Sequence, residues 1–203
     1  TFITTLALWS ALRGYSLFIT EGRPIAISNK PFRYFFGGDV LGLPTVTWIM
    51  LIVFLIFWFI SKYTVLGTNI YAVGGNPKAA RSIGLNVDRI KIITLMTTGL
   101  FSALVGILFV ARVSSGNSTV GEGMEFDVIA AVVVGGTALG GAIGTMTGTL
   151  LGVLFIAMIS NGLIHWGIDP DLNKVVKGII IFLAVVINSN VTFKKNSGNK
   201  EEE

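Results

Sequence analysis

The sequence predicts an all-α fold, a polytopic bundle of transmembrane helices with about six membrane elements. The first observation is composition: 52% of the 203 residues are apolar and 13% are charged, whereas soluble domains carry about 25% charged residues. The second is that the charges lie in short polar segments between long apolar ones. The third is a glycine cluster that interrupts the longest charge-free interval. A soluble enzyme is therefore the first class to be excluded.

The scarcity of cysteine and histidine removes further classes. The chain has no cysteine and one histidine, which leaves no disulfide scaffold, no thiol nucleophile and no zinc site with the usual ligands. The net charge is +4, but the 15 lysines and arginines do not gather into one basic face. Nucleic acid is therefore not expected as a partner. We expect neither catalysis nor a cofactor in this chain.

The first predicted element is a membrane helix over residues 1–20. This segment is apolar apart from Arg13, and an arginine in such a helix faces the bundle interior or the membrane interface. The chain opens with Thr1 inside an apolar stretch. We therefore expect it to be the carboxyl-terminal part of a longer polypeptide.

The next two elements are charge-free intervals of membrane length. Residues 40–61 hold 22 uncharged residues, with an unbroken apolar run at 48–60, and residues 92–111 hold 20. A hydrocarbon core about 30 Å thick needs a helix of about 20 mostly apolar residues. Each interval is therefore predicted to be one transmembrane helix.

The longest charge-free interval, residues 128–164, holds 37 residues. One straight helix of that length would be about 55 Å long, which is too long for a bilayer. Glycine weakens helices and permits turns, so we predict a short element at 127–139, a break, and a full span at 145–165. Irregular backbone at membrane depth is buried or lines a cavity, so the short element is a candidate for the translocation path. The break is expected among Gly135, Gly136, Gly140, Gly141 and Gly144.

The last predicted span, residues 178–193, holds 16 uncharged residues and is long enough if Lys177 snorkels to the interface. Lysine and arginine mark the cytoplasmic side of a membrane. The connection 61–91 holds five of them against one acid, and the tail 194–203 holds three lysines. Both are therefore predicted to be cytoplasmic, with the carboxyl terminus inside. The connections predicted to lie outside are 21–44, 114–127 and 167–173.

The connection 61–91 contains a candidate docking helix. Asn76 is suited to cap a helix whose first residue is Pro77, because proline lacks the N–H that would be unpaired there. Gly84 is expected to end this helix after about two turns. Ala79 and Ala80 are small and would let another surface approach closely. The alternative is an ordinary loop helix that rests on the membrane surface.

The glycine-rich interval carries the candidate path residues. Glycines recur at every fourth position from Gly136 to Gly152. This spacing leaves one face of a helix without side chains, so that a neighbouring helix can pack closely against Gly148 and Gly152. Asn161 is an amide within a span and must find hydrogen-bond partners, either the transported solute or a neighbouring helix. Three neighbours are candidates for the translocation path or gate, with helix packing as the alternative: Gly135, Gly136 and Thr137.

An ordered set of motifs carries a family resemblance over nearly the whole chain except the tail. Together the motifs resemble the membrane permease subunit of bacterial ABC sugar importers, with ribose-type permeases as the nearest relatives. No single motif is specific, but the ordered set is. The motifs are TEGRP at 20–24, YAVGGNPKAARSIG at 71–84, AR at 111–112, GEGMEFDVIAAVVVGGT at 121–137, GTLLG at 148–152, NGL at 161–163 and VKG at 176–178.

The resemblance implies the type II importer architecture, in which two permease copies form a homodimer in the bacterial cytoplasmic membrane. The implied partners are a cytoplasmic ABC ATP-binding subunit, which would hold ATP and Mg, and an extracytoplasmic sugar-binding protein. The lipid bilayer that surrounds the permease is the third implied partner. The chain would divide into a transmembrane permease domain, 1–193, with a cytoplasmic coupling loop, 61–91, and a polar cytoplasmic tail, 194–203.

The resemblance also makes the predicted docking helix the coupling helix that sits in a cleft of the ATPase. Importers of this kind often show the motif EAAxxxG here, whereas this chain has KAARSIG at 78–84. A base thus replaces the acid at Lys78, so no ionic contact at that position is carried over. The residues assigned to coupling are Gly74, Gly75, Asn76, Pro77, Ala79, Ala80 and Gly84.

Three functions are open. The leading hypothesis is ATP-driven import of a monosaccharide, with ribose ahead of xylose, galactose, arabinose, inositol or a furanosyl compound. The alternative is a secondary transporter or channel for a small neutral solute that works without an ATPase. Ion coupling usually relies on intramembrane Asp, Glu or His, and the predicted spans offer only Arg13 and His165 near their edges. The third is a purely structural membrane subunit.

Overall fold

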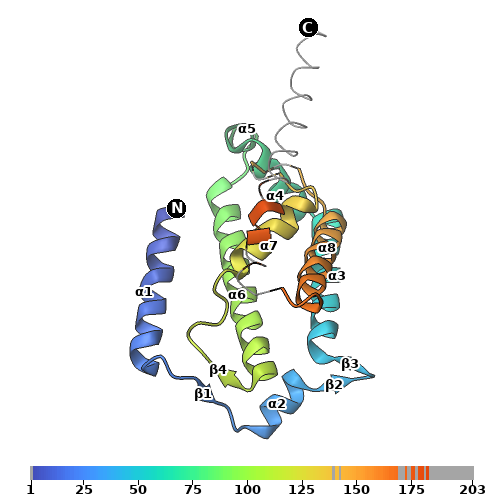
Figure 1. Cartoon of the computed structure of the whole chain (residues 1–203). Helices are drawn as coiled ribbons and strands as arrows, with labels where there is room; N and C mark the ends of the chain where they lie inside the picture. The colour runs from blue at the N-terminus through green and yellow to red at the C-terminus, as the bar shows by residue number, and fades with distance from the viewer. Residues whose placement is uncertain are drawn as a thin grey trace. The chain divides into compact units, whose positions relative to one another are not determined.

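The protein is mostly helical (Figure 1). The computed structural model describes residues 2–138, 140–141, 143–168, 172, 175–176, 178–180 and 182. Within these residues lie eight α-helices and four strands of two residues each. The helices are α1 (Phe2–Thr20), α2 (Lys30–Gly37), α3 (Thr45–Tyr63), α4 (Val65–Gly75), α5 (Pro77–Ser82), α6 (Val87–Val113), α7 (Met124–Val134) and α8 (Met146–His165). The strands are β1 (Ile25–Ala26), β2 (Asp39–Val40), β3 (Leu43–Pro44) and β4 (Ser115–Gly116).

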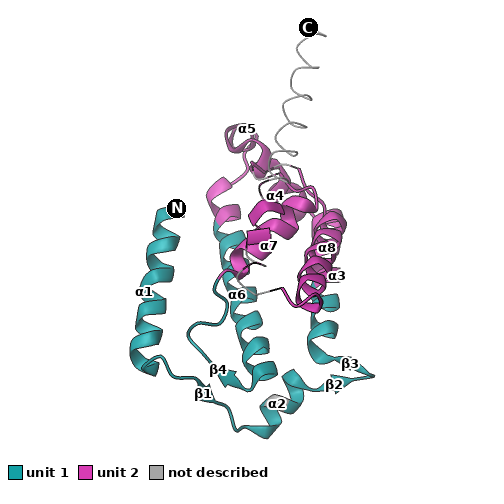
Figure 2. Cartoon of the chain, in the orientation of Figure 1, with its two compact units in different colours: residues 1–53, 92–122 teal, residues 54–91, 123–203 magenta. Residues whose placement is uncertain are grey.

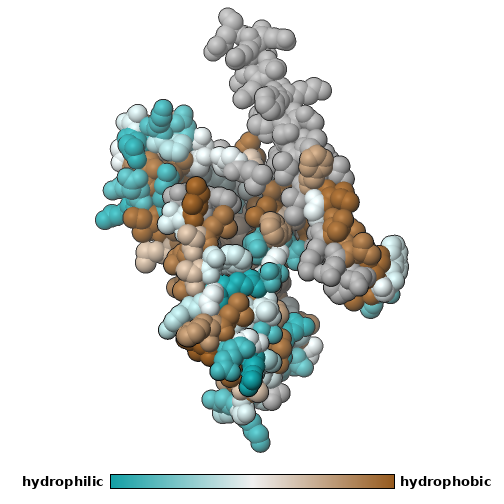
Figure 3. Space-filling model, turned by 60° about the vertical axis from the view of Figure 1, so that its left-hand side comes forward, coloured by the Kyte–Doolittle hydropathy of each residue, from teal (hydrophilic) through white to brown (hydrophobic). Residues whose placement is uncertain are grey.

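Three of the described helices are long and apolar enough to cross a membrane: α3, α6 and α8. None of the residues of α3 is buried. Many large hydrophobic side chains of the described residues are exposed, and Figure 3 shows several patches of them on the face in view. The predicted helix at the amino terminus is present as α1, but it is not one of the three. Most of the predicted span 178–193 and the whole tail 194–203 lie outside the described residues.

The chain divides into two compact units, and the division falls within α3 and α6 (Figure 2). In the first unit, residues 1–53 and 92–122, β1 pairs antiparallel with β4 so that Ile25 lies opposite Gly116. β2 and β3 form a second antiparallel pair. The β1–β4 pair lies in connections that the sequence analysis left without regular structure. The β2–β3 pair corrects the predicted span 40–61: its first residues form a turn with positive φ at Leu41 and Gly42, and the helix α3 begins only at Thr45.

The helix α2 was not predicted, although its start carries the same signal as Asn76 and Pro77. The Asn29 side chain accepts a hydrogen bond from the Phe32 N–H at 3.4 Å, and Pro31 lies in the first turn. Proline in the first turn removes a donor that would be unpaired there. The connection 21–44 therefore holds a capped eight-residue helix.

Polar side chains join α1 to the segment before α7 within the first unit. The Arg13 guanidinium pairs with the Glu122 carboxylate at 2.6 Å and lies over the Trp9 ring at 5.3 Å. The side chain of Arg13 is only 19% exposed. The Ser118 hydroxyl is 3.0 Å from that of Ser16, one turn further along α1. Arg13 is thus paired, as an arginine in an apolar helix requires.

In the second unit, residues 54–91 and 123–203, α7 packs against α8. Ala130, Ala131 and Ile156 form a buried cluster between the two helices. The predicted break is confirmed: α7 ends at Val134, with Gly135 as its cap, and α8 begins after Thr145. The Thr145 hydroxyl caps α8 by accepting from the Gly148 N–H at 3.0 Å. The short helix begins and ends a few residues before its predicted limits.

The close approach of α7 and α8 depends on glycine at position 152. A Cβ added there would lie 2.8 Å from the Gly135 nitrogen and would also contact the Ala131 carbonyl oxygen. Both are backbone atoms that cannot turn aside as a side chain would. The predicted packing role of Gly152 is thus visible in the α7–α8 contact.

Gly152→Leu is therefore expected to destabilise the protein by about 1–3 kcal/mol, the usual cost of overpacking. The measurement is the melting temperature of the detergent-solubilised protein. Gly162→Leu is the matched control on the same helix, because a Cβ at Gly162 meets nothing within 4 Å. An equal loss of stability in both variants would contradict the packing role.

Candidate functional site

The predicted coupling helix is present as α5, with the predicted cap and stop. The Asn76 side chain accepts hydrogen bonds from the Lys78 and Ala79 N–H groups, both at 3.1 Å, and Pro77 is the first helical residue. Gly84 has a φ of +87°, which glycine adopts without strain. The helix has six residues, so it is somewhat shorter than two turns.

The two alanines predicted for docking face different surroundings. Ala80 is buried in a small core with Val73 and Val87, whereas Ala79 is exposed. Ala80 therefore anchors α5 to the adjoining segments, and its small size is needed inside the unit. Ala79 is the residue of the pair that offers room to a partner.

Ile83 is a residue that the sequence analysis missed. It caps the carboxyl end of α5 and is 74% exposed, although its side chain is large and apolar. It lies four residues after Ala79, so the two share one side of the helix end. The nearby ion pair between Arg81 and Asp88, at 3.4 Å, joins two exposed side chains and adds little stability. The sequence did contain a signal for this residue, because Ile83 is an isolated apolar residue directly before Gly84, which ends the helix.

The connection 61–91 also contains α4, which was not predicted. The Thr64 hydroxyl caps it by accepting from the Gly67 N–H at 3.2 Å. Gly67 lies so close to the end of α3 that a Cβ there would be 2.7 Å from the Ser61 carbonyl oxygen. Glycine disfavours helix formation, but Gly67 allows this close packing. α5 therefore follows a helix rather than a loop.

The predicted gate residues lie at the glycine break, which is the segment 135–145. Gly135 packs on α8: a Cβ there would lie 2.7 Å from the Gly148 carbonyl carbon. Gly136 has a φ of +84° and open space around its Cα. The Thr137 side chain lies beside Gly144, since a Cβ at Gly144 would be 2.8 Å from the Thr137 hydroxyl. Gly135 therefore has a packing role, while Gly136 has a conformational one.

Asn161 is not brought to the glycine break. It lies 16 residues after Thr145 on α8, which corresponds to about 24 Å along the helix axis at 1.5 Å per residue. Its side chain is exposed. Of the predicted path residues, the consecutive residues 135–137 therefore lie at the glycine break, and Asn161 lies apart from them.

The coupling segment and the glycine break meet within the second unit. A Cβ added to Gly141 would lie 3.0 Å from the carbonyl carbon of Gly74. The Tyr71 hydroxyl donates a hydrogen bond to the Gly144 carbonyl oxygen at 3.0 Å. The sequence analysis treated the two sites separately, because contacts between segments about 70 residues apart leave no local signal.

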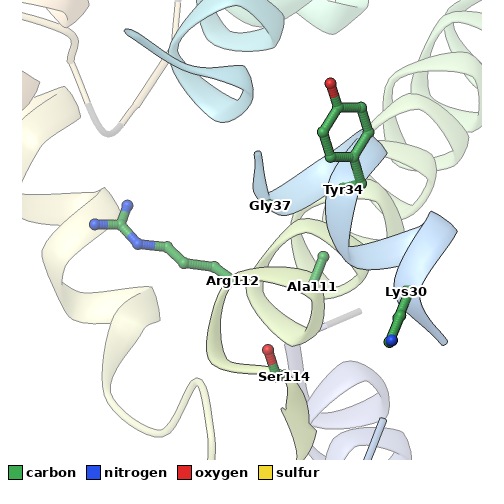
Figure 4. Close-up of a pocket in the computed structure, with 6 residues that line it drawn as sticks. All are labelled: Lys30, Tyr34, Gly37, Ala111, Arg112 and Ser114. Atoms are coloured by element: carbon green, nitrogen blue, oxygen red, sulfur yellow. The ribbon is translucent and has the colours of Figure 1, made fainter. Parts of the chain in front are cut away.

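A shallow pocket of about 300 Å³ lies in the first unit. Figure 4 shows the guanidinium of Arg112 directed away from Lys30 and Tyr34, so the polar ends do not converge. Across the described residues, no group of three or more histidine or acidic side chains is placed to hold a metal ion. The pocket is lined by Lys30, Tyr34, Gly37, Ala111, Arg112 and Ser114.

Three helices of membrane length, a short helix that ends at glycines and a capped helix between two of the long ones are features of a polytopic membrane protein. The family described as branched-chain amino acid transport system, permease component, matches residues 1–185. The chain belongs to this family. A transport subunit rather than an enzyme was predicted, and the family confirms it.

The curated relatives of the chain are also permease proteins. The chain is 46% identical over 199 residues to the probable ABC transporter permease protein YphD of Escherichia coli K12, covering 98% of this chain and 60% of YphD. It is 44% identical over 192 residues to the ribose import permease protein RbsC of the same strain, covering 93% and 60%. It is 35% identical over 186 residues to the L-arabinose transport system permease protein AraH, also of that strain, covering 92% and 57%.

These matches confirm the resemblance to bacterial ABC sugar permeases. The chain spans about 60% of the length of the curated relatives it matches. No solved structure matches the chain.

Proposed function

We propose that this protein is the permease subunit of an ATP-driven ABC importer that moves a monosaccharide into a bacterial cell. The observation that carries the proposal is the 44% identity to a ribose import permease, which includes the segment folded here as the capped helix α5. The lower identity to an arabinose permease, 35%, favours ribose or a related sugar as the substrate.

The proposed arrangement has about six membrane elements, including the short helix α7, in a permease domain over 1–193. The coupling loop 61–91 and the tail 194–203 lie on the cytoplasmic side, because the loop carries five lysines and arginines and the tail carries three lysines. Two permease copies form the translocation path of a type II importer. The partners are a cytoplasmic ABC subunit that binds ATP and Mg, and an extracytoplasmic sugar-binding protein.

The proposed mechanism is alternating access. ATP binding closes the nucleotide-binding subunits, and α5 conveys this closure from their surface to the membrane helices. The exposed residues Ala79 and Ile83 form the contact, while Gly74, Gly75, Asn76, Pro77, Ala80 and Gly84 shape and anchor the helix.

The path is proposed to pass the glycine break. Gly135 and Gly136 set the course of the backbone there, and Thr137 offers a hydroxyl group. A neutral sugar needs only such weak polar contacts, because it carries no charge to be neutralised. Asn161 provides a second polar contact at another depth along α8.

The test is sugar uptake by the native transporter, purified with its partners and reconstituted in vesicles. We expect uptake of ribose, or of a related pentose, that requires ATP and the binding protein. Uptake that persists without ATP but follows a proton gradient would contradict the proposal and favour a secondary transporter. Heat-stability shifts of the copurified binding protein with individual sugars would identify the substrate.

A further inference from the structure

The helix α4 touches both the segment that carries α5 and the glycine break. All of these contacts lie within the second unit. α4 leads directly into α5, with one residue, Asn76, shared as the cap between them. Its contacts therefore decide whether a movement of α5 can reach the glycine break.

The first contact is a hydrogen-bond relay through Tyr71 on α4. The Tyr71 hydroxyl is 3.0 Å from the Gly144 carbonyl oxygen and 3.1 Å from the Ser61 hydroxyl. A carbonyl oxygen only accepts, so the single Tyr71 proton goes to Gly144, and the Ser61 hydroxyl donates to the Tyr71 oxygen. The relay joins the last turn of α3, the middle of α4 and the residue before the cap of α8. It thus fixes where α8 begins relative to α4.

The second contact is backbone packing one turn further along α4. Gly141, with a φ of +90°, approaches Gly74 so closely that a Cβ would lie 3.2 Å from the Gly74 Cα. Backbone atoms in such contact do not slide past each other without separating. The end of α4 is therefore held against the glycine break at Gly74 as well as at Tyr71.

The same carboxyl-terminal end of α4 is also joined to α5, through the shared cap residue Asn76. The Asn76 N–H donates to the Ala72 carbonyl oxygen at 3.1 Å. Val73 on α4, Ala80 on α5 and Val87 at the start of α6 form one buried cluster. Closely packed side chains transmit displacement because they have few voids to absorb it. A movement of α5 is thus passed to α4.

We infer that α4 is a strut that carries movements of α5 to the glycine break, with Tyr71 as its positioning residue. This inference rests on the proposed function, in which α5 is the coupling helix and the break is part of the path. A contiguous set of packed and hydrogen-bonded groups connects the two sites, and such networks can carry coupling between sites. Removing one bond of the strut weakens transmission without removing either site.

The test is Tyr71→Phe in the native transporter, reconstituted with its ATPase and binding protein. The ring and its packing stay, and only the hydroxyl is lost. We expect the number of sugars transported per ATP hydrolysed to fall about fivefold, the factor that corresponds to one neutral hydrogen bond. Copurification of the ATPase and the melting temperature of the complex are expected to stay close to wild type.

Two further variants sharpen the test. Tyr15→Phe is the matched control, because Tyr15 is 65% exposed, and its transport ratio is expected to equal that of wild type. Ser61→Ala removes the other end of the relay and is expected to lower the ratio about twofold. In the double variant Ser61→Ala, Tyr71→Phe the ratio is expected to match that of Tyr71→Phe alone, since coupled residues are not additive.

The outcomes separate the inference from the function on which it rests. A wild-type transporter without ATP-dependent sugar uptake would overturn the proposed function, and the strut with it. A coupled wild-type transporter in which Tyr71→Phe leaves the transport ratio unchanged would overturn the strut alone. A parallel fall of the ratio and the melting temperature would also overturn it, because Tyr71 would then act only on stability.

Discussion

Ala79→Trp is expected to weaken the binding of the permease to its ATPase and to reduce ATP-driven uptake accordingly. Ala79 is exposed on α5, whereas its neighbour Ala80 is buried. A tryptophan at position 79 therefore projects into the partner's space without disturbing the protein's own core. Overpacking of a close-fitting contact costs about 1–3 kcal/mol, which corresponds to about a fivefold to more than a hundredfold loss of affinity.

The measurement for this variant is the amount of ATPase that copurifies with the permease, together with uptake in vesicles. Ala79→Ser is the control for size, and we expect it to behave as wild type. Ala80→Trp is less informative, because it would disrupt the cluster with Val73 and Val87. Full copurification and full uptake by Ala79→Trp would remove α5 from the contact with the ATPase.

Gly136→Val is expected to reduce uptake about tenfold or more while the complex still assembles. Gly136 has a φ of +84° and open space around it, so the side chain itself fits. A β-branched residue at positive φ is strained, by about 1–3 kcal/mol. The backbone at the glycine break therefore shifts, and with it the path that Gly136 and Thr137 are proposed to line.

Two controls separate backbone conformation from side-chain volume at this site. Gly136→Asn keeps most of the activity, because asparagine tolerates positive φ better than other residues do. Gly140→Val adds the same volume where nothing lies within 4 Å and where φ is not positive, and it is expected to cost little. Equal uptake by Gly136→Val and wild type would show that the break has no part in the path.

Local signals in the sequence predicted two of the helices whose first N–H groups are capped by a side chain. Thr145 was predicted as the start and His165 as the end of a span, and α8 occupies Met146–His165. Asn76 and Pro77 marked the start of α5 in the same way. In both helices, groups close in sequence satisfy the first free N–H groups. Such contacts can be deduced from the residues alone.

Two helices were missed for different physical reasons. α2 starts with Asn29 and Pro31 and was predictable from its cap, but its connection contains several glycines and prolines that are typical of loops. α4 was missed because it contains three glycines, and glycine has a low helix propensity. Close packing of Gly67 on α3 and of Gly74 on Gly141 compensates for that propensity, and neither contact is local.

The roles of individual site residues were the hardest to predict. Ala79 and Ala80 looked equivalent, because a helix of six residues is too short for a hydrophobic period to identify its buried side. Gly135 was predicted as a path residue with helix packing as the alternative, and only the folded chain shows that it lies against the backbone of Gly148. Ile83 and Tyr71 were missed, since only the folded chain shows the exposure of the former and the partners of the latter.

The most direct test of the account is chemical cross-linking from α5 to the ATPase. The chain contains no cysteine, so Ser82→Cys adds a single thiol to it at an exposed position on α5. Thr119→Cys is the control, since it lies in a connection predicted to be on the other side of the membrane. The account predicts a cross-link to the ATP-binding subunit from position 82 and none from position 119. A transporter in which position 82 gives no cross-link, or in which both positions react alike, would contradict it.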